Sequence, residues 1–155
     1  MHPLKTAAAA CAAAIMLSAA PAFAGECPAG QASANALPGA ATAPSRVTDD
    51  VISSIDLGNG YGLPGRNLRM RRLEVQPGGV VPLHSHAERP ANIYIVSGEV
   101  TEYSSACAVP ITHRAGDVVA EQGDTSHWWR NNSRRRAVLI SADLPPPAES
   151  ARGGM

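Results

Sequence analysis

A series of short β-strand signals, with no helical period among them, limits most strongly what this chain can fold into. Apolar and β-branched residues gather in short segments, and Gly, Pro or Asn stands at most of the joins between them. Short strands at this spacing predict an all-β sandwich or barrel. Order is expected to begin near Val47, and the predicted strands are residues 67–75, 80–86, 93–96, 100–103, 111–113, 117–121, 128–130 and 137–142.

The first of these strands changes parity along its length. Leu68 and Met70 lie on one face of an extended strand, whereas Leu73 and Val75 lie on the other. This change predicts a bulge or twist at the arginine pair between them. The Pro-Gly-Gly sequence that follows predicts a turn before the next strand.

The amino terminus has the pattern of a signal peptide that spans residues 1–24. Lys5 gives a short basic region, residues 7–20 form an alanine-rich apolar region, and residues 22–24 fit the small-x-small cleavage pattern. A retained membrane anchor is the alternative, but the apolar region is shorter than the ~20 residues that span a bilayer. We therefore expect export to a bacterial periplasm or secretion.

The mature chain divides into three parts. Residues 25–45 contain Ala, Gly, Pro and Ser with almost no large apolar residue, which predicts a flexible arm. Residues 46–144 hold the strand signals and form the predicted barrel domain. Residues 145–155, which begin with a run of prolines, form an extended C-terminal tail.

Two cysteines remain after cleavage, because Cys11 leaves with the leader. Cys27 lies in the arm and Cys107 in the barrel domain. An even pair in an oxidising compartment predicts a structural disulfide that ties the arm to the main body. Two unrelated thiols or a reactive pair are the alternatives, and no Cys-x-x-Cys spacing supports the reactive pair.

The charge balance excludes several classes of partner. Basic and acidic residues number 13 each, and aromatic residues make up 4% of the chain. Without a basic field we expect no nucleic acid and, after cleavage, no membrane as partner. The sequence also has no Gly-x-Ser-x-Gly nucleophile elbow and no Gly-rich loop that opens a helix.

Three histidines carry the chemistry that the sequence does suggest. His84 and His86 are two residues apart in a strand, so their side chains share one face while Ser85 between them points away. A third, His127, can join them from a strand adjacent in space. Three imidazoles can hold one divalent transition metal, Fe, Mn, Ni, Cu or Zn, and leave positions open for a small molecule. A solvated strand face is the alternative for a His-x-His pair.

The spacing around these histidines resembles two motifs of the cupin superfamily, in its type-2 form. Residues 78–98 place His84 and His86 as in the first motif, G-x5-H-x-H-x3,4-E-x6-G, and residues 116–131 place His127 as in the second, G-x5-P-x-G-x2-H-x3-N. The resemblance implies a jelly-roll β-barrel, or double-stranded β-helix, with a metal in its mouth and these three histidines as ligands. It also makes a homodimer a candidate assembly.

The chain departs from the first motif at its carboxylate. Ala91 stands where most metal-binding cupins have the glutamate ligand. Glu88 has the parity of the histidines and is one conceivable replacement; a three-histidine centre, as in the thiol and diketone-cleaving dioxygenases among cupins, is another. A site too weak to retain a metal is the third. In the second motif, Gln122 replaces the proline and Asp124 the glycine.

Three residues near the histidines are candidates for substrate binding. Arg89 can orient a carboxylate or sulfonate, and Gln122 offers a side-chain amide. Trp129 shares the parity of His127 and can line the barrel, whereas Trp128 faces the other side of the strand. A salt bridge of Arg89 to Glu88 and simple indole packing are the alternatives.

Two functions follow for the metal site. One is a metal-dependent dioxygenase or related oxidoreductase that acts on a small molecule. The other is a non-catalytic module that binds a metal or a small ligand. The fold does not choose between them, because function depends on the site and not on the barrel.

Overall fold

The computed structural model describes residues 26–147, and this part of the chain contains six antiparallel strands. The predicted signal peptide and most of the predicted tail lie outside this range. Within it, no helix has the length and apolar character of a membrane span. The strands are β1 (Ser45–Asp56), β2 (Asn67–Ser97), β3 (Glu99–Ser104), β4 (Ile111–Arg114), β5 (Val118–Arg130) and β6 (Ala137–Asp143).

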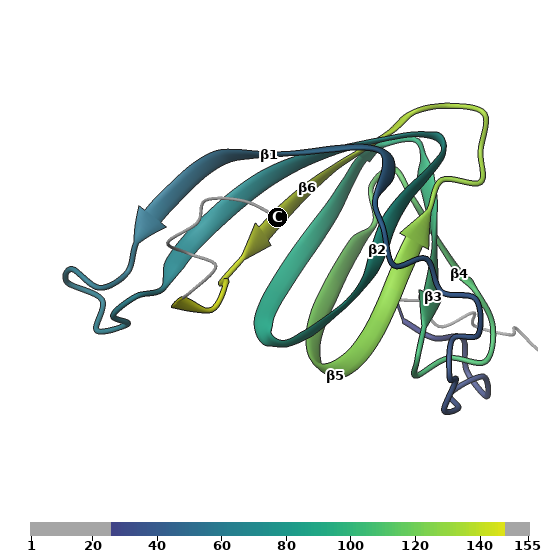
Figure 1. Cartoon of the computed structure of the whole chain (residues 1–155), viewed down its shortest axis with the longest axis horizontal. Coiled ribbons are helices and arrows are strands. Elements are labelled where there is room, and N and C mark those ends of the chain that lie inside the picture. Colours follow the sequence, from purple (N-terminus) through teal and green to yellow (C-terminus); the bar gives the residue numbers. More distant parts are fainter. Residues whose placement is uncertain (1–25, 148–155) are drawn as a thin grey trace, which may run out of the picture.

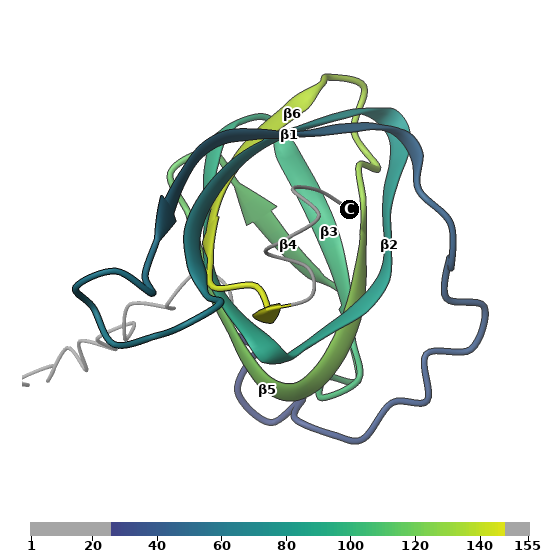
Figure 2. The ribbon, with the colours of Figure 1, turned by 60° about the vertical axis from the view of Figure 1, so that its left-hand side comes forward.

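The long strand β2 closes the barrel because its two ends pair with opposite edges of β6. Arg69–Val75 pairs with one edge and Ala91–Ser97 with the other. The middle of β2 pairs instead with β5, which continues the sheet to β3 and β4. Figure 2 shows β2 and β5 running around this ring, and Figure 1 shows β1 along its outer side. The predicted all-β jelly-roll class is confirmed.

Strands β2 and β5 each join segments that the sequence separates. The Pro-Gly-Gly sequence bends β2 without ending it, since the backbone goes on pairing with β1 and β5. Gly78 has φ +75°, and a Cβ on Gly79 would lie 2.6 Å from the carbonyl oxygen of Arg46. Glycine is therefore required here for conformation at the first position and for space at the second.

The inward face of β2 contains arginines as well as apolar residues. Arg69 and Arg71 are buried, whereas Leu68 and Met70 are 43% and 41% exposed. Parity thus runs unbroken along this part of β2, and the predicted bulge there is wrong; the register shift lies in β1 instead. The arginines are tolerated inside because they meet buried carboxylates. We call this set the charge cluster: Asp49, Arg69, Arg71, Arg89 and Asp143.

The apolar core fills the rest of the barrel. Its members come from the inward faces of β2, β3, β5 and β6, and Trp129 is the largest of them. The core cluster is Leu73, Val75, Val81, Ala91, Ile93, Ile95, Val100, Val119, Trp129, Ala137 and Leu139.

The arm lies against the loop between β3 and β4 (Figure 1). The predicted disulfide joins Cys27 to Cys107 across a sequence separation of 80 residues. The structure adds contacts that the composition did not predict, because Ala32 forms a β-bridge with Cys107 and the Asn35 side chain donates to the Cys107 carbonyl at 3.1 Å. The arm is therefore anchored at several points along its first half.

Candidate metal centre

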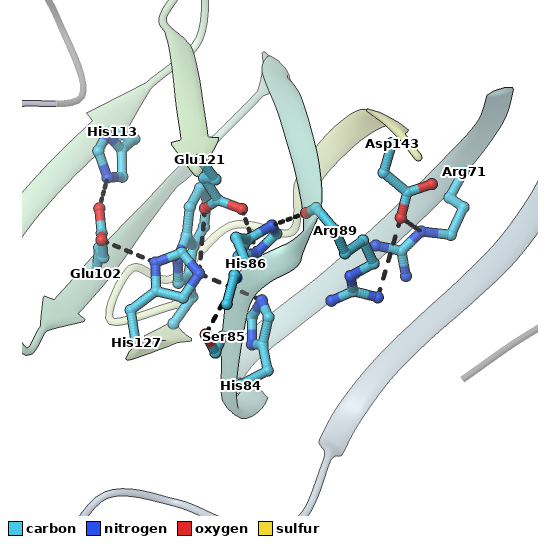
Figure 3. Close-up of polar contacts among 12 residues, drawn as sticks. Arg71, His84, Ser85, His86, Arg89, Glu102, His113, Glu121, His127 and Asp143 are labelled. Atoms are coloured by element: carbon cyan, nitrogen blue, oxygen red, sulfur yellow. Dashed lines mark hydrogen bonds and ion pairs between the residues drawn. The ribbon is translucent and has the colours of Figure 1, made fainter. Parts of the chain in front are cut away.

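Strand pairing between β2 and β5 brings the three predicted histidines together. His84 lies directly opposite His127, and His86 lies farther along the same face of β2. Glu121 on β5 lies directly opposite Ala91, the position at which the first motif has glutamate. A carboxylate thus reaches the site from the neighbouring strand (Figure 3).

Four atoms that can bind a metal converge between β2 and β5, and all four lie within 4.8 Å of one another. Each comes from a different residue. We call these residues the donor cluster: His84, His86, Glu121 and His127. The Nε2 atoms of His84 and His127 are 3.2 Å apart. Oε2 of Glu121 lies 2.7 Å from His86 Nε2, and Oε1 lies 3.4 Å from His127 Nε2. This is a group of the size and composition that can hold one metal ion.

The outer ring nitrogens show which way each imidazole is oriented. Nδ1 of His84 lies 2.8 Å from the carbonyl oxygen of Pro82, and Nδ1 of His86 lies 2.7 Å from that of Arg89. Nδ1 of His127 lies 2.8 Å from Glu102 Oε1. Each of these oxygens only accepts, so each Nδ1 donates and each neutral ring has its lone pair on Nε2. Three lone pairs and one carboxylate then point into the same space.

Burial and neighbouring charges shift the pKa values of this region. Burial, helped by His127, lowers the pKa of His84 to about 3. For His127, burial lowers the pKa, but the hydrogen bond to Glu102 and the charge of Glu121 outweigh it, so the pKa is raised. A proton on His127 therefore competes with a metal ion more strongly than a proton on His84 does.

Buried atoms without a hydrogen-bond partner indicate whether a metal ion fits between these four residues. Among residues 26–147, His86 Nε2 and both carboxylate oxygens of Glu121 are buried without a well-formed hydrogen bond. Buried polar atoms without partners are costly, and a cation at the point where they converge would satisfy them all. Imidazole nitrogen with one carboxylate oxygen suits Mn, Fe, Ni, Cu or Zn, so the residues present fit a divalent transition metal.

A further buried pair supports His127 from behind. Glu102 on β3 accepts from His127 with one oxygen and from His113 Nε2 with the other, each at 2.8 Å. Burial alone would raise the pKa of Glu102, but the hydrogen bonds from His113 and His127 outweigh it and lower the pKa to about 2. Glu102 is thus a carboxylate that fixes the orientation of one donor ring.

The other predicted site residues lie around the cluster without joining it. Glu88 is exposed, and its carbonyl oxygen accepts from Arg66. Arg89 Nη1 is 3.9 Å from Asp143 Oδ2, so its side chain points toward the charge cluster (Figure 3). Gln122 is exposed at the rim of the cavity beside the donors.

Trp129 is buried and packs against histidines on both sides. Its ring stacks on His113 with centroids 5.0 Å apart and meets His127 edge to face at 5.9 Å. Trp128 lies on the opposite face of β5 and stacks on Tyr103 at 4.2 Å. The predicted parity of the two tryptophans is therefore correct, and Trp129 contacts the donor ring of His127 both edge to face and through its Nε1, which lies 3.3 Å from His127 Nδ1.

Glu121 is the donor that the sequence analysis missed. Motif counting looked for a carboxylate near Gly98 on β2, but the carboxylate comes from β5. A signal was present, because Val119, Glu121 and His127 share one parity and all three are buried, although the register of β5 against β2 shifts between Glu121 and His127. The predicted gap between residues 121 and 128 hid this continuity.

A cavity of about 160 Å³ opens beside the donors. Its walls include three of the four donor residues and several small or apolar side chains, together with Cys27 of the arm. The lining residues are Cys27, His86, Glu102, Ser104, Ala106, Ile111, Val119, Ala120, Glu121, Gln122, Thr125 and His127.

Known proteins share this fold. A model of the cupin domain matches residues 71–143. The cupin domain of Cnp3 from Schizosaccharomyces pombe superposes with a TM-score of 0.53 at 11% identity, covering 70% of this chain and 71% of that chain. A predicted oxalate decarboxylase from Thermotoga maritima gives 0.52 at 16% identity, covering 70% and 94%. No curated protein matches the sequence. At these identities the two structures establish the fold alone.

Proposed function

The chain belongs to the cupin superfamily, and from that premise we propose that it is a metal-dependent oxidoreductase whose divalent ion is held by the donor cluster. The observation that carries the proposal is the orientation of the three rings. Every Nδ1 has an acceptor on the outside, and every Nε2 faces inward toward Glu121. When the three rings are neutral, such a set presents four acceptors at its centre, which is the arrangement that a cation requires.

The protein around the cluster supplies the place for a substrate. The cavity beside His86, Glu121 and His127 has the volume for a small molecule next to the donors. When bound, a redox-active transition metal supplies Lewis acidity and electron transfer there. The Cys27–Cys107 disulfide is compatible with an oxidising compartment, which supports the proposal that the protein works outside the cytoplasm.

A non-catalytic binding module is the second candidate, and one observation favours it. Both oxygens of Glu102 are engaged by histidines, and the other polar side chains of the cavity that do not belong to the donor cluster, those of Ser104, Thr125 and Gln122, are neutral. Among the described residues the cavity therefore contains no carboxylate or imidazole free to act as a general base. Oxygen uptake by the metal-loaded protein with oxalate, a diketone or a thiol separates the two functions.

A carboxylate exchange across the strand pair tests the metal site. Because Glu121 and Ala91 are register partners on one inward face, we expect Glu121→Ala to weaken metal binding and the double change Ala91→Glu with Glu121→Ala to restore much of it. The loss should exceed the roughly 10- to 100-fold cost of removing an outer partner of a ligand. Metal content of protein purified from its own cells and titration of metal-free protein give the measurements.

The exchange also decides between two donor sets. If Glu121→Ala keeps full affinity while His86→Ala loses it, the centre is a three-histidine site, and Glu121 is only a neighbour. If neither change affects the metal content, the donor cluster holds no metal and the proposal fails. Ala91→Glu alone is the matched control for crowding of the core at this position.

A further inference from the structure

The cavity beside the donor cluster is bounded on one side by the arm and its disulfide. Cys27 and Ala106 line it together with Glu121 and His127, although the first pair lies at the disulfide and the second in the barrel. Ala106 is the residue before Cys107, and its carbonyl oxygen accepts from Ser33 in the arm. The arm thus forms part of the wall that faces the donors.

We propose that this wall restricts the site to ligands of about six non-hydrogen atoms, and that the Cys27–Cys107 disulfide maintains the restriction. The inference rests on the proposed function and names the size class of its substrate. A cavity of about 160 Å³ is close to the size of an engineered cavity that admits benzene. Small carboxylates, thiols and diketones fit such a volume, whereas a larger molecule must extend through its open side or displace the arm.

The disulfide is the covalent cross-link that holds the arm, whose other contacts with the β3–β4 loop are hydrogen bonds and one β-bridge. Gln31, Ala32, Ser33 and Ala34 are all exposed. Its backbone makes three hydrogen bonds with the β3–β4 loop: Ser33 N donates to Ala106 O at 3.2 Å, Asn35 N donates to Ser105 O at 2.8 Å and Ala108 N donates to Gln31 O at 2.9 Å. Solvent-exposed hydrogen bonds of this kind open readily, since water replaces them at small net cost.

Loss of the disulfide is therefore expected to release the arm and not the barrel. The Cys107 side of the bond belongs to a loop that keeps its own contacts with β5, because Ser105 N donates to Ser126 O at 2.8 Å and Ser126 N donates to Ser105 Oγ at 3.0 Å. The Cys27 side has no such support among residues 26–30 beyond the bond from Gln31 N to Pro28 O. The arm wall would move away while the donor cluster stays in place.

The first test compares ligand size in cobalt-loaded protein. Acetate and benzoate are titrated into the wild type and into the Cys27→Ser, Cys107→Ser double variant, and the visible absorption of the cobalt reports binding. We expect acetate to bind both proteins equally, and benzoate to bind the double variant at least 10-fold more tightly than the wild type. Ser33→Ala is the matched control, because its hydroxyl bonds only to the neighbouring Ala34 carbonyl. Equal benzoate affinity in all three proteins overturns the proposal.

The second test needs no metal. Diethyl pyrocarbonate modifies accessible imidazoles, and mass spectrometry reads the rate at His86 and His127 in metal-free protein. We expect both rates to rise several-fold in the double variant, while His113, which is behind Glu102 and fully buried, stays slow. If the protein binds no cobalt, the proposed function fails, but the modification rates still test whether the arm limits access to the cavity. Unchanged rates in the double variant overturn the proposal about the arm.

Reduction of the wild type replaces the double variant if that variant does not fold. A dithiol reagent transfers two electrons and two protons to the Cys27–Cys107 bond, which becomes two thiols, and the reagent becomes a cyclic disulfide. The same benzoate and modification measurements are then made before and after reduction. The wall model requires both to increase after reduction and to return on reoxidation.

Discussion

Two buried polar clusters lie next to each other in the barrel, and they differ in how they are satisfied. In the charge cluster, donors meet acceptors: Arg69 binds Asp143 through Nε and Nη2 at 3.0 and 2.8 Å, and Arg71 binds Asp49. In the donor cluster, which is named for its metal-donor atoms, hydrogen-bond acceptors face each other, since three imidazole lone pairs point toward the Glu121 carboxylate. Figure 3 shows Arg89 between the two clusters.

This difference indicates the role of each cluster. In the charge cluster, guanidinium groups lie against carboxylates of opposite charge, so no further ion is required there, although Asp49 Oδ1 and Arg71 Nε have no well-formed hydrogen bond. Lone pairs that converge on a carboxylate are satisfied only when a cation joins them. Burial alone does not identify a functional site in this protein; the mismatch between donors and acceptors does.

The largest expected effect comes from breaking the charge cluster. Asp143→Asn leaves Arg69 and Arg71 buried without their shared carboxylate, and removing one partner of a buried ion pair typically costs about 3–5 kcal/mol. Urea unfolding of metal-free protein measures the loss. In the same assay Glu121→Gln should cost less, since the groups beside this carboxylate are imidazoles and not guanidinium groups.

An exposed ion pair gives the control for that comparison. Arg136 and Glu74 pair at 2.7 Å, but their side chains are 52% and 23% exposed. Glu74→Gln should therefore cost less than about 1 kcal/mol. If Asp143→Asn were no more costly than Glu74→Gln, the charge cluster would not stabilise the fold as its geometry indicates.

The fold was largely predictable from the strand pattern, but the extent of the strands was not. Alternation of apolar residues located parts of β2 to β6, and β6 was predicted within one residue of its observed end. Strand β1 was not predicted as a strand, because the sequence indicated only that order begins near Val47. The continuity of β2 depends on backbone pairing with three other strands, which is a long-range property. The inward arginines Arg69 and Arg71 escaped prediction because parity was judged from apolar residues alone, and their acceptor Asp143 lies far along the chain.

The site was predictable to the extent that local spacing determines it. His84 and His86 share a face by parity alone, and the motif resemblance supplied His127. Glu121 became visible only once the register of β2 against β5 placed it opposite Ala91. Glu102 and His113 have inward parity on their own strands, but nothing local indicates that one carboxylate holds two rings.

The next largest expected effect is a loss of metal affinity when Glu102, the carboxylate that orients His127, is changed. Glu102→Gln keeps an acceptor for only one of His113 and His127 and removes the negative charge behind the donor. Loss of such an outer partner typically lowers metal affinity 10- to 100-fold. Competition titration with a chelating dye measures the affinity.

Glu99→Gln is the matched control for this change. Glu99 lies on the same strand, but its ion pair with Arg114 is exposed and far from the donors in the strand register. Metal affinity should not change in this variant. Equal affinities in wild type and Glu102→Gln would mean that packing by Trp129 is sufficient to orient His127.

The smallest effect is a pH dependence that separates the clusters. In metal-free protein the pKa of His84 falls from 6.5 to about 3 on folding, so below pH 6.5 the unfolded chain binds a proton that the folded chain does not. The free energy of unfolding should therefore decrease as the pH is lowered below 6.5, by up to about 1.4 kcal/mol per pH unit. His127 has a raised pKa and adds no slope below 6.5, and Glu102 contributes only below its ordinary 4.5.

His84→Asn isolates that contribution, because Asp49, whose pKa burial raises, acts in the opposite direction and is the same in both proteins. Urea unfolding with a chelator present, at pH 6.5 and at pH 5, should show the wild type losing more stability on acidification than the variant. Added metal should hide the difference at pH 6.5, since it occupies the lone pair that the proton would take. Parallel losses in the two proteins would mean that His84 takes up its proton as readily in the folded state as in the unfolded chain, and the donor cluster would then lose the property that sets it apart from the charge cluster.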